Sequence, residues 1–191
     1  DGISIADDWD VMGMRATGSQ TIEFADVFIP DSAIALSRPK DEFHPVWGVV
    51  LTVALPLIMA AYVGIAEKAF QIALDKGKKS SGNSDQLSYM IGKLNNSLLS
   101  AQSQLKMMST LTNDFDFKPN DINNVQVLSY KTNISEATKQ VVSEAMEIVG
   151  GQSFYRSNTL ERLFRDVQAS PFHPLPKWDQ YKFTGDRLLN S

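Results

Sequence analysis

The stretch EAMEIVGGQSFYRSNTLERLFRDVQASPFH, residues 144–173, decides the fold of this 191-residue chain. It begins as the end of a long amphipathic helical pattern and breaks at Gly150 and Gly151. After a short polar loop, a charged helical turn restarts near Thr159. Paired glycines at a helix end allow left-handed backbone and let another group approach the main chain closely. For two glycines alone a plain helix C-cap is the simpler interpretation, and the charged string that follows adds weight to a functional one.

Two long amphipathic helices are predicted before this stretch. The first carries an apolar stripe with alternating spacings of four and three residues: Leu87, Ile91, Leu94, Leu98, Ala101, Leu105 and Met108. The second carries a similar stripe: Val127, Tyr130, Ile134, Ala137, Val141, Ala145 and Ile148. Ser84 or Asp85 can cap the first helix, which should end near Asn113, and Asp121 or Asn123 can cap the second. Narrow stripes joined by a short loop predict an antiparallel pair.

A third long helix is predicted from Val46 onward, because residues 46–66 include no charged side chain. This run is long enough to cross a membrane. We reject that interpretation, since Pro56 interrupts the run, two glycines weaken it, and an amphipathic pattern continues beyond Glu67. A helix that is apolar on all sides fits the centre of a bundle or a subunit interface equally well. Pro56 should kink this helix or mark its true start.

The predicted fold is mainly α, an up-and-down four-helix bundle preceded by a few β-strands. Its fourth member is the helix at residues 159–167, and a last helix follows at about 178–189. The bundle domain should span residues 46–191. Residues 31–45, which are punctuated by prolines, are predicted to be a connector.

Residues 1–30 are predicted to be the remaining strands of a β-domain. Ile3 and Ile5 alternate with polar neighbours, as does Ile22, and the alternation breaks at Asp26, which predicts a bulge or bend. Two or three strands are too few to be stable alone, so they must pack on something larger.

Two residues near the start of the chain are assigned structural roles. Arg15 lies in a probable turn between glycines and could bind an anion, but an ion pair with Asp8 or Asp10 is the simpler interpretation. His44 stands beside Pro45 and is predicted to be a surface or capping histidine.

Composition excludes several classes of function. The net charge is −4, so no basic face indicates nucleic-acid binding. The chain has no cysteine and only two histidines, His44 and His173, which argues against a metal site and excludes disulfides. No signal-peptide pattern is visible at the first residues, and we expect a cytoplasmic protein with no membrane partner.

Two motifs resemble the acyl-CoA dehydrogenase superfamily of flavoproteins. The C-terminal one is the glycine pair followed by LERLFRD at 160–166. The N-terminal one is MGMRATGS at 12–19 followed by FADVFIP at 24–30. Together the resemblance spans nearly the whole chain and implies the last strands of the β-domain plus the C-terminal bundle. The upstream domains that hold most of the flavin ring would then lie outside this chain, which alone should be inactive.

The resemblance also implies where a catalytic base should stand. Dehydrogenases of this family use a glutamate to remove the α-proton of an acyl thioester, which requires a carboxylate in a dry pocket. One family position falls at Pro174, eight residues after Asp166, and the other falls at Ala54. Both positions lack an acid, so ordinary acyl-CoA dehydrogenation is not expected.

Another branch of the family, the flavin-dependent monooxygenases, resembles this sequence in the run SPFHP at 170–174. In that branch a histidine in this segment helps to deprotonate a phenol or to stabilise a flavin hydroperoxide. His173 is therefore the candidate catalytic residue, with flanking prolines to fix its backbone and an imidazole that titrates in the useful range. The alternative is a histidine that only fills a turn.

The resemblance implies that Gly150 and Gly151 approach the diphosphate part of FAD bound mainly by another subunit. Glu147 stands where the family usually has a glutamine that joins them, and its charge is unfavourable near a diphosphate. The loop at 76–85 also lacks the family's arginine, although one of its lysines could substitute. We therefore expect FAD as cofactor, with FMN possible, in a homodimer or homotetramer built through the bundle.

The leading hypothesis is the C-terminal part of a flavin-dependent oxidoreductase that uses reduced flavin and oxygen on a small molecule. The first alternative is an acyl-CoA dehydrogenase with an atypical base. The second is a non-catalytic bundle that only oligomerises. An acyl-CoA thioester or an aromatic compound would be the substrate, and no metal is expected.

Overall fold

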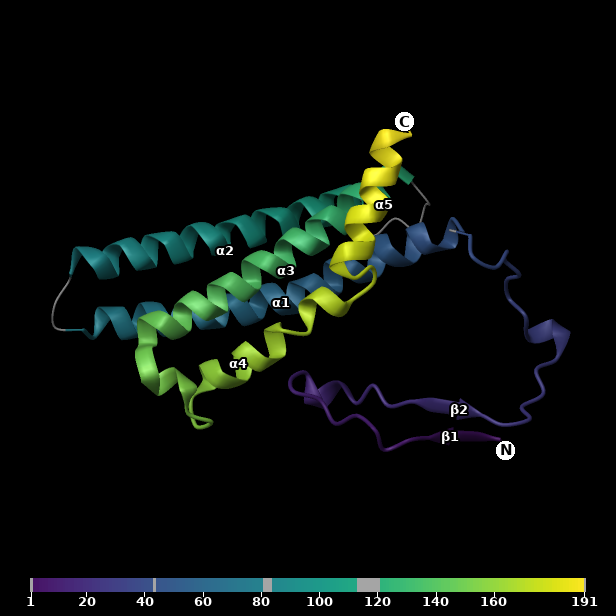
Figure 1. The fold of residues 1–191 in the computed structure, drawn as a ribbon, viewed down its shortest axis with the longest axis horizontal. Helices are drawn as coiled ribbons and strands as arrows, with labels where there is room; N and C mark the ends of the chain where they lie inside the picture. Colours follow the sequence, from purple (N-terminus) through teal and green to yellow (C-terminus); the bar gives the residue numbers. More distant parts are fainter. Residues whose placement is uncertain (1, 43, 81–83, 113–120, 191) are drawn as a thin grey trace.

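The computed structural model describes residues 2–42, 44–80, 84–112 and 121–190, with only the main chain at 121–123. Five α-helices follow an N-terminal hairpin in the described part of the chain (Figure 1). They are α1 (Val46–Lys78), α2 (Asp85–Leu111), α3 (Asp121–Val149), α4 (Thr159–Val167) and α5 (Lys177–Leu189). Short 3-10 turns are η1 (Arg15–Thr17), η2 (Asp31–Ala33), η3 (Gly150–Phe154) and η4 (Ser170–Phe172). The predicted up-and-down four-helix bundle is confirmed, with α1 to α4 as its members.

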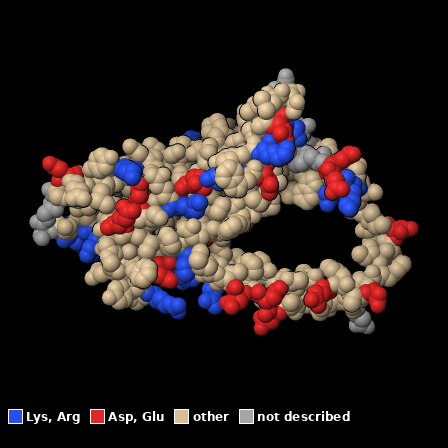
Figure 2. All heavy atoms as spheres, viewed as in Figure 1, with Lys and Arg blue, Asp and Glu red and all other residues tan. Residues whose placement is uncertain are grey.

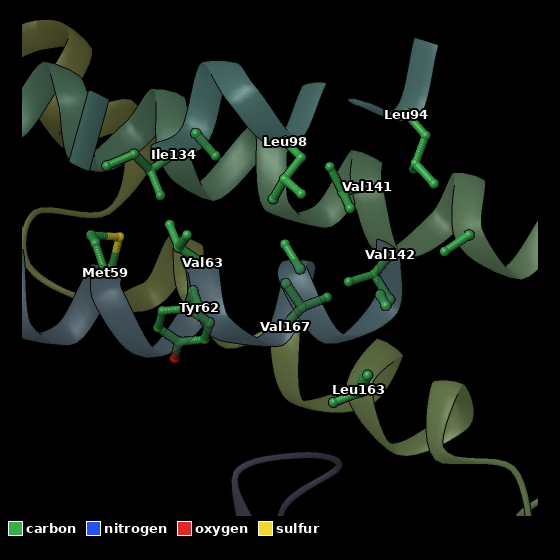
Figure 3. Packing of buried hydrophobic residues seen from close by; sticks show 14 of the residues in the cluster. Met59, Tyr62, Val63, Leu94, Leu98, Ile134, Val141, Val142, Leu163 and Val167 are labelled. Carbon is green, nitrogen blue, oxygen red and sulfur yellow. The ribbon is translucent and has the colours of Figure 1, made fainter. Parts of the chain in front are cut away.

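The core lies between the three long helices, with α4 closing one side. The predicted stripes supply much of it, because Leu94, Leu98, Val141 and Ala145 are all buried. Figure 3 shows Leu94 and Leu98 of α2 pointing at α3, and Met59 and Val63 of α1 lying below Ile134 of α3. α3 buries a second row as well, which includes polar residues: Leu128, Lys131, Ser135, Thr138 and Val142. A wide buried face on α3 is expected for the helix that contacts α1, α2, α4 and α5.

Helix α1 begins at Val46 and runs unbroken through Pro56, so the proline is not its true start. The Thr52 hydroxyl donates to the Gly48 carbonyl at 2.8 Å. Among the described helices, α1 alone is long and apolar enough to cross a membrane. One of its sides is buried against α2 and α3, which is the packing of a bundle helix, whereas Val50 and Leu57 remain exposed. The subunit interface predicted for this helix stays a prediction.

The N-terminal segment forms a two-stranded antiparallel hairpin of β1 (Ile3–Ile5) and β2 (Ile22–Phe24). Ile3 pairs with Phe24, and both strands are exposed on both faces. The predicted bend at Asp26 is present as a left-handed residue with φ of +51°. Figure 2 shows acidic side chains along this segment and an open gap between the connector and the bundle. Two three-residue strands are not stable alone, so the segment depends on its contacts with α4.

The connector leads into α1 through His44. The Val46 amide donates to His44 Nδ1 at 3.2 Å, which satisfies one of the free N–H groups at the helix start. The predicted capping role of His44 is confirmed.

Candidate active site

The Arg165-Asp166 pair joins the N-terminal loop to the bundle. The Arg165 guanidinium donates to the Met12 carbonyl at 2.7 Å, and the Met14 amide donates to Asp166 Oδ1 at 2.7 Å. Arg165 is held in turn by both carboxylate oxygens of Glu161, at 2.7 and 3.0 Å. Arg165 therefore forms an ion pair with the acidic residue one helical turn before it. It also positions a segment more than 150 residues away in sequence, which was not predicted.

Gly13 lies where the loop meets α4 most closely. A Cβ built on Gly13 would stand 2.2 Å from the Arg165 carbonyl oxygen and 2.8 Å from the Asp166 amide nitrogen. Both atoms belong to the main chain and cannot swing aside. Glycine is therefore required here by close approach, whatever its backbone conformation.

The loop after α4 carries His173 and is held to α3 by hydrogen bonds. The hydroxyls of Ser135 and Ser170 are hydrogen-bonded at 2.7 Å and buried. The Lys131 ammonium donates to the carbonyls of Pro171 and Leu175. These contacts hold the main chain on both sides of His173.

His173 forms a hydrogen bond with Tyr62 of α1, with 2.7 Å between Nε2 and the phenol oxygen. The two rings are tilted by 58°, and their centroids are 5.4 Å apart. The Tyr62 ring belongs to the core, but its hydroxyl points out of the core on the side where the N-terminal loop passes (Figure 3). A core aromatic thus supplies a polar atom to the surface where His173 lies.

Burial sets the ionisation of this pair. It raises the pKa of Tyr62 to about 12, and the charge of Asp166 acts in the same direction. It also lowers the pKa of His173 below 6.5, and the positive charge of Lys131 lowers it further. At neutral pH the phenol keeps its proton and the imidazole is uncharged. When Nε2 carries the hydrogen and donates it to the Tyr62 oxygen, Nδ1 is the free acceptor that can take up a proton.

A cavity of about 450 Å³ opens beside this pair, between the N-terminal loop and the end of α4. Its lining is mostly apolar: Trp9, Val11, Met12, Gly13, Met14, Thr17, Ser19, Tyr62, Arg165, Gln168, Ala169, Phe172 and His173. The volume and character are those of a site for a small organic molecule. In the part of the chain that the structure describes, none of the lining residues is Asp or Glu.

The glycine turn lies at the other end of α4. Gly150 has φ of +76°, and a Cβ at either Gly150 or Gly151 would meet nothing within 4 Å. Both glycines and Glu147 are exposed, and none of them lines the cavity at His173. Nine residues of α4 separate the two places, about 14 Å at 1.5 Å per residue. The structure therefore keeps the predicted cofactor residues apart from the predicted catalytic one.

One prediction about the N-terminal loop was wrong. Among the described residues no ion pair joins Arg15 to Asp8 or Asp10, and Arg15 is exposed. Asp8 instead accepts hydrogen bonds from the Thr21 amide and hydroxyl, which lower the pKa of its carboxyl. The hairpin brings Thr21 beside Asp8, so a neutral residue from the opposite arm is the partner of the carboxylate.

Tyr62 and Lys131 were missed by the analysis of the sequence. A signal existed for Lys131, because it lies four residues after Val127 and three before Ile134 and therefore borders the predicted apolar stripe. A lysine at a core position of a helix needs partners inside the protein. Tyr62 had no comparable signal, since an aromatic residue in an apolar helix is usually core.

The sequence of the bundle, from α1 to the loop of His173, matches one known family. A family model described as "Acyl-CoA dehydrogenase, C-terminal domain" matches residues 51–173, which cover most of the chain. The chain belongs to the acyl-CoA dehydrogenase family. The match runs from the first turns of α1 to His173, so it includes Tyr62, Lys131 and the glycine turn.

Members of the acyl-CoA dehydrogenase family similar to this chain differ in their named activities. The provisionally named acyl-CoA dehydrogenase YdbM of Bacillus subtilis (strain 168) is 30% identical over 91% of this chain. The amino sugar nitrososynthase DnmZ of Streptomyces peucetius is 28% identical over 96% of it. The chain spans 46% of the length of each of these relatives.

Among solved structures, KijD3 in complex with FMN and a dTDP-linked amino-keto sugar has a TM-score of 0.85 and 24% identity. The likeness covers 99% of this chain and 49% of KijD3. It shows that the fold of this acyl-CoA dehydrogenase family chain is kept over its whole length.

Proposed function

We propose that this chain is the C-terminal half of a flavin-dependent oxidoreductase that uses reduced flavin and oxygen on a small molecule. The observation that carries the proposal is the composition of the cavity. The titratable groups in its lining are the neutral His173, its partner Tyr62 and Arg165, which is paired with Glu161, and a carboxylate is missing from the described lining. Removal of an α-proton from a thioester needs a base of the carboxylate kind in the family, whereas a neutral imidazole suits a phenol or an amine.

The residues present fit a flavin. The mostly apolar cavity accepts a flat ring system, and the open surface at Gly150 and Gly151 lets a diphosphate approach the main chain. Phe154 and Tyr155 stand beside that turn with exposed rings. FAD would use both features, with its ring at the cavity of one copy and its diphosphate at the glycine turn of another, whereas FMN would use the cavity and not the turn. Because the glycine turn and the cavity lie at opposite ends of α4, we propose that the turn serves a flavin held mainly by a second copy in a homo-oligomer.

The chemistry supplied by a bound reduced flavin would be transfer of one atom of O₂ to the substrate, with the other released as water. The residues of this chain perform the acid–base part. His173 accepts the proton that the substrate must lose before it attacks oxygen, and the Tyr62 hydrogen bond keeps the imidazole turned toward the cavity. Trp9, Met12 and Phe172 present apolar surface that excludes water.

A second candidate function is α,β-dehydrogenation of an acyl-CoA, which is favoured by the resemblance to YdbM. The base would then be His173 itself. One experiment on the full-length protein distinguishes the two functions. Anaerobic bleaching of the bound flavin by an acyl-CoA would support dehydrogenation. Oxygen uptake with externally reduced flavin, coupled to consumption of an amine or phenol, would support the oxygenase. Absence of bound flavin and of both reactions would leave the non-catalytic bundle and contradict the proposal.

The proposal predicts an acid limb in the pH profile of turnover. His173 must be neutral to accept a proton, and burial lowers its pKa below 6.5, so the active form persists to more acid pH than for a free histidine. Turnover should therefore fall only as the pH drops through a value under 6.5. The kcat measured against pH checks this. An acid limb centred above 6.5 would show that His173 is not the group that titrates.

The proposal also predicts that Glu147→Gln strengthens flavin binding. The exposed carboxylate of Glu147 stands one turn before Gly150, and its removal relieves repulsion of a diphosphate. An exposed charge contributes up to about 1 kcal/mol, so the Kd for FAD should fall up to about fivefold. The gain should shrink at high salt. Fluorescence titration of apoprotein with FAD measures it, with Glu67→Gln on α1 as the matched control. An unchanged Kd in Glu147→Gln would place the diphosphate elsewhere.

A further inference from the structure

Lys131 is a buried cation that the proposed reaction does not use. Its side chain is 0% exposed, and it lies on α3 in the buried row between Leu128 and Ser135. Lysine is almost never fully buried unless its ammonium has partners. Burial lowers the pKa of Lys131 to about 8, so the side chain is still mostly charged at neutral pH. Burial of an ammonium is unfavourable because it removes the charge from water, so its presence here indicates that the hydrogen bonds it makes matter to the structure.

The partners of the ammonium are two main-chain carbonyls of the His173 loop. Nζ donates to the oxygen of Pro171 at 3.0 Å and to that of Leu175 at 2.9 Å. One carbonyl lies two residues before His173 and the other lies two residues after it. Prolines at 171, 174 and 176 have no N–H to donate, so the loop cannot hold its own shape by a ladder of main-chain bonds. A donor from outside the loop is needed, and Lys131 supplies it.

Lys131 does not reach a ligand itself. It is absent from the lining of the cavity, whereas His173 is part of that lining. Any effect of Lys131 on a bound molecule must therefore pass through the loop. The Ser135–Ser170 hydrogen bond, one turn farther along α3, fixes only the start of the loop and leaves the residues around His173 to Lys131.

We propose that Lys131 is a positioning residue, which clamps the main chain on both sides of His173 and so fixes the direction in which the imidazole meets Tyr62. This inference rests on the proposed function for its catalytic consequence. The structural part of the inference, that the orientation of His173 depends on Lys131, does not require the proposed function.

The electrostatic surroundings of His173 allow a sharp test. The ionisable groups near it are Tyr62 from α1, Lys131 from α3, and Arg165 and Asp166 from α4. At the start of α5, Lys177 is already paired with Glu136. Of these groups, Lys131 is the one whose charge lowers the pKa of His173, in addition to burial. Loss of the lysine removes that charge, and release of the loop into water removes the burial. Both effects raise the pKa of His173.

The test compares Lys131→Met with Lys139→Met, which removes a partly exposed lysine of the same helix. Both are made in the protein as its gene encodes it, with ¹⁵N-labelled histidine, and His173→Ala assigns the ring signals. In Lys131→Met we expect the pKa of His173 to rise toward 6.5 and its ring signals to broaden. We expect kcat to fall about tenfold or more with KM changed far less, since a misplaced acid–base group costs turnover. Lys139→Met should match the wild type.

An unchanged pKa of His173 in a folded Lys131→Met protein would overturn the inference, even if turnover fell. If Lys131→Met does not fold, the wild type still decides. Its His173 ring signals should show a second inflection near pH 8, where Lys131 loses its proton. A single inflection would overturn the inference. If His173→Ala keeps full turnover while Lys131→Met shifts the pKa of His173, the proposed function fails and the positioning role stands.

Discussion

Replacing His173 with alanine should lower turnover by about a hundredfold or more while leaving the fold intact, since a positioned acid–base group contributes on this scale. The imidazole is the group in the described cavity that can accept a proton at neutral pH, because the phenol of Tyr62 has a pKa of about 12. Its removal leaves the bundle core untouched, since His173 sits in a loop at the cavity wall. Steady-state kcat with the substrate that supports turnover measures the loss, and circular dichroism checks the fold.

The other histidine of the chain provides the matched control. His44 caps α1 and does not line the cavity, so His44→Ala should keep full turnover at the expense of a small loss of stability, about 1 kcal/mol. The turnover of Tyr62→Phe should lie between those of His173→Ala and His44→Ala, because this change keeps the ring and removes only the hydrogen bond to Nε2. Equal turnover in His173→Ala and in the wild type would remove His173 from the active site.

Replacing Gly13 with alanine should detach the N-terminal loop from the bundle. The added methyl group would stand 2.2 Å from the Arg165 carbonyl oxygen, so either the loop or α4 must move. Overpacking of this kind costs about 1–3 kcal/mol. The movement also breaks the bonds of Met12 and Met14 with the Arg165-Asp166 pair. Because the loop forms one wall of the cavity, we expect turnover to fall by about tenfold or more, as a small misplacement of a site wall can cause.

Two measurements report the detachment directly. The Met14 amide donates to Asp166 in the wild type, so its hydrogen exchange should become faster in Gly13→Ala. Trypsin should also cut more readily after Arg15, which is already exposed. Gly92→Ala, in the exposed part of α2, adds the same methyl group where nothing lies within 4 Å and should be neutral or slightly stabilising. A protected Met14 amide with normal turnover in Gly13→Ala would show that the loop does not need this close approach.

The helices of the bundle could be predicted because their causes are local. Ser84 caps α2 and Asn158 caps α4 through bonds to amides two or three residues away. The apolar stripes repeat at the period of a helix and bury themselves wherever the helix packs. The break at Gly150 was also local, since a residue with φ of +76° favours glycine.

The candidate site was only half predictable. His173 was found through its motif, but Tyr62 lies 111 residues away on another helix, and no spacing rule relates the two. Arg165 and Asp166 were part of the C-terminal motif, but the motif gave no sign that they hold the main chain at Met12 and Met14. Asp8, one of the two acids expected to pair with Arg15, accepts a hydrogen bond from Thr21 instead.

The sequence by itself predicted the helices and the family and singled out His173 as a candidate, because each of these depends on side chains within a few turns of one another. Only the tertiary structure decided what surrounds that histidine: the phenol of Tyr62, the ammonium of Lys131 and the apolar wall of the N-terminal loop. The reason is physical. The orientation and pKa of His173 depend on burial and on charges brought by distant segments, and these exist only once the chain has packed.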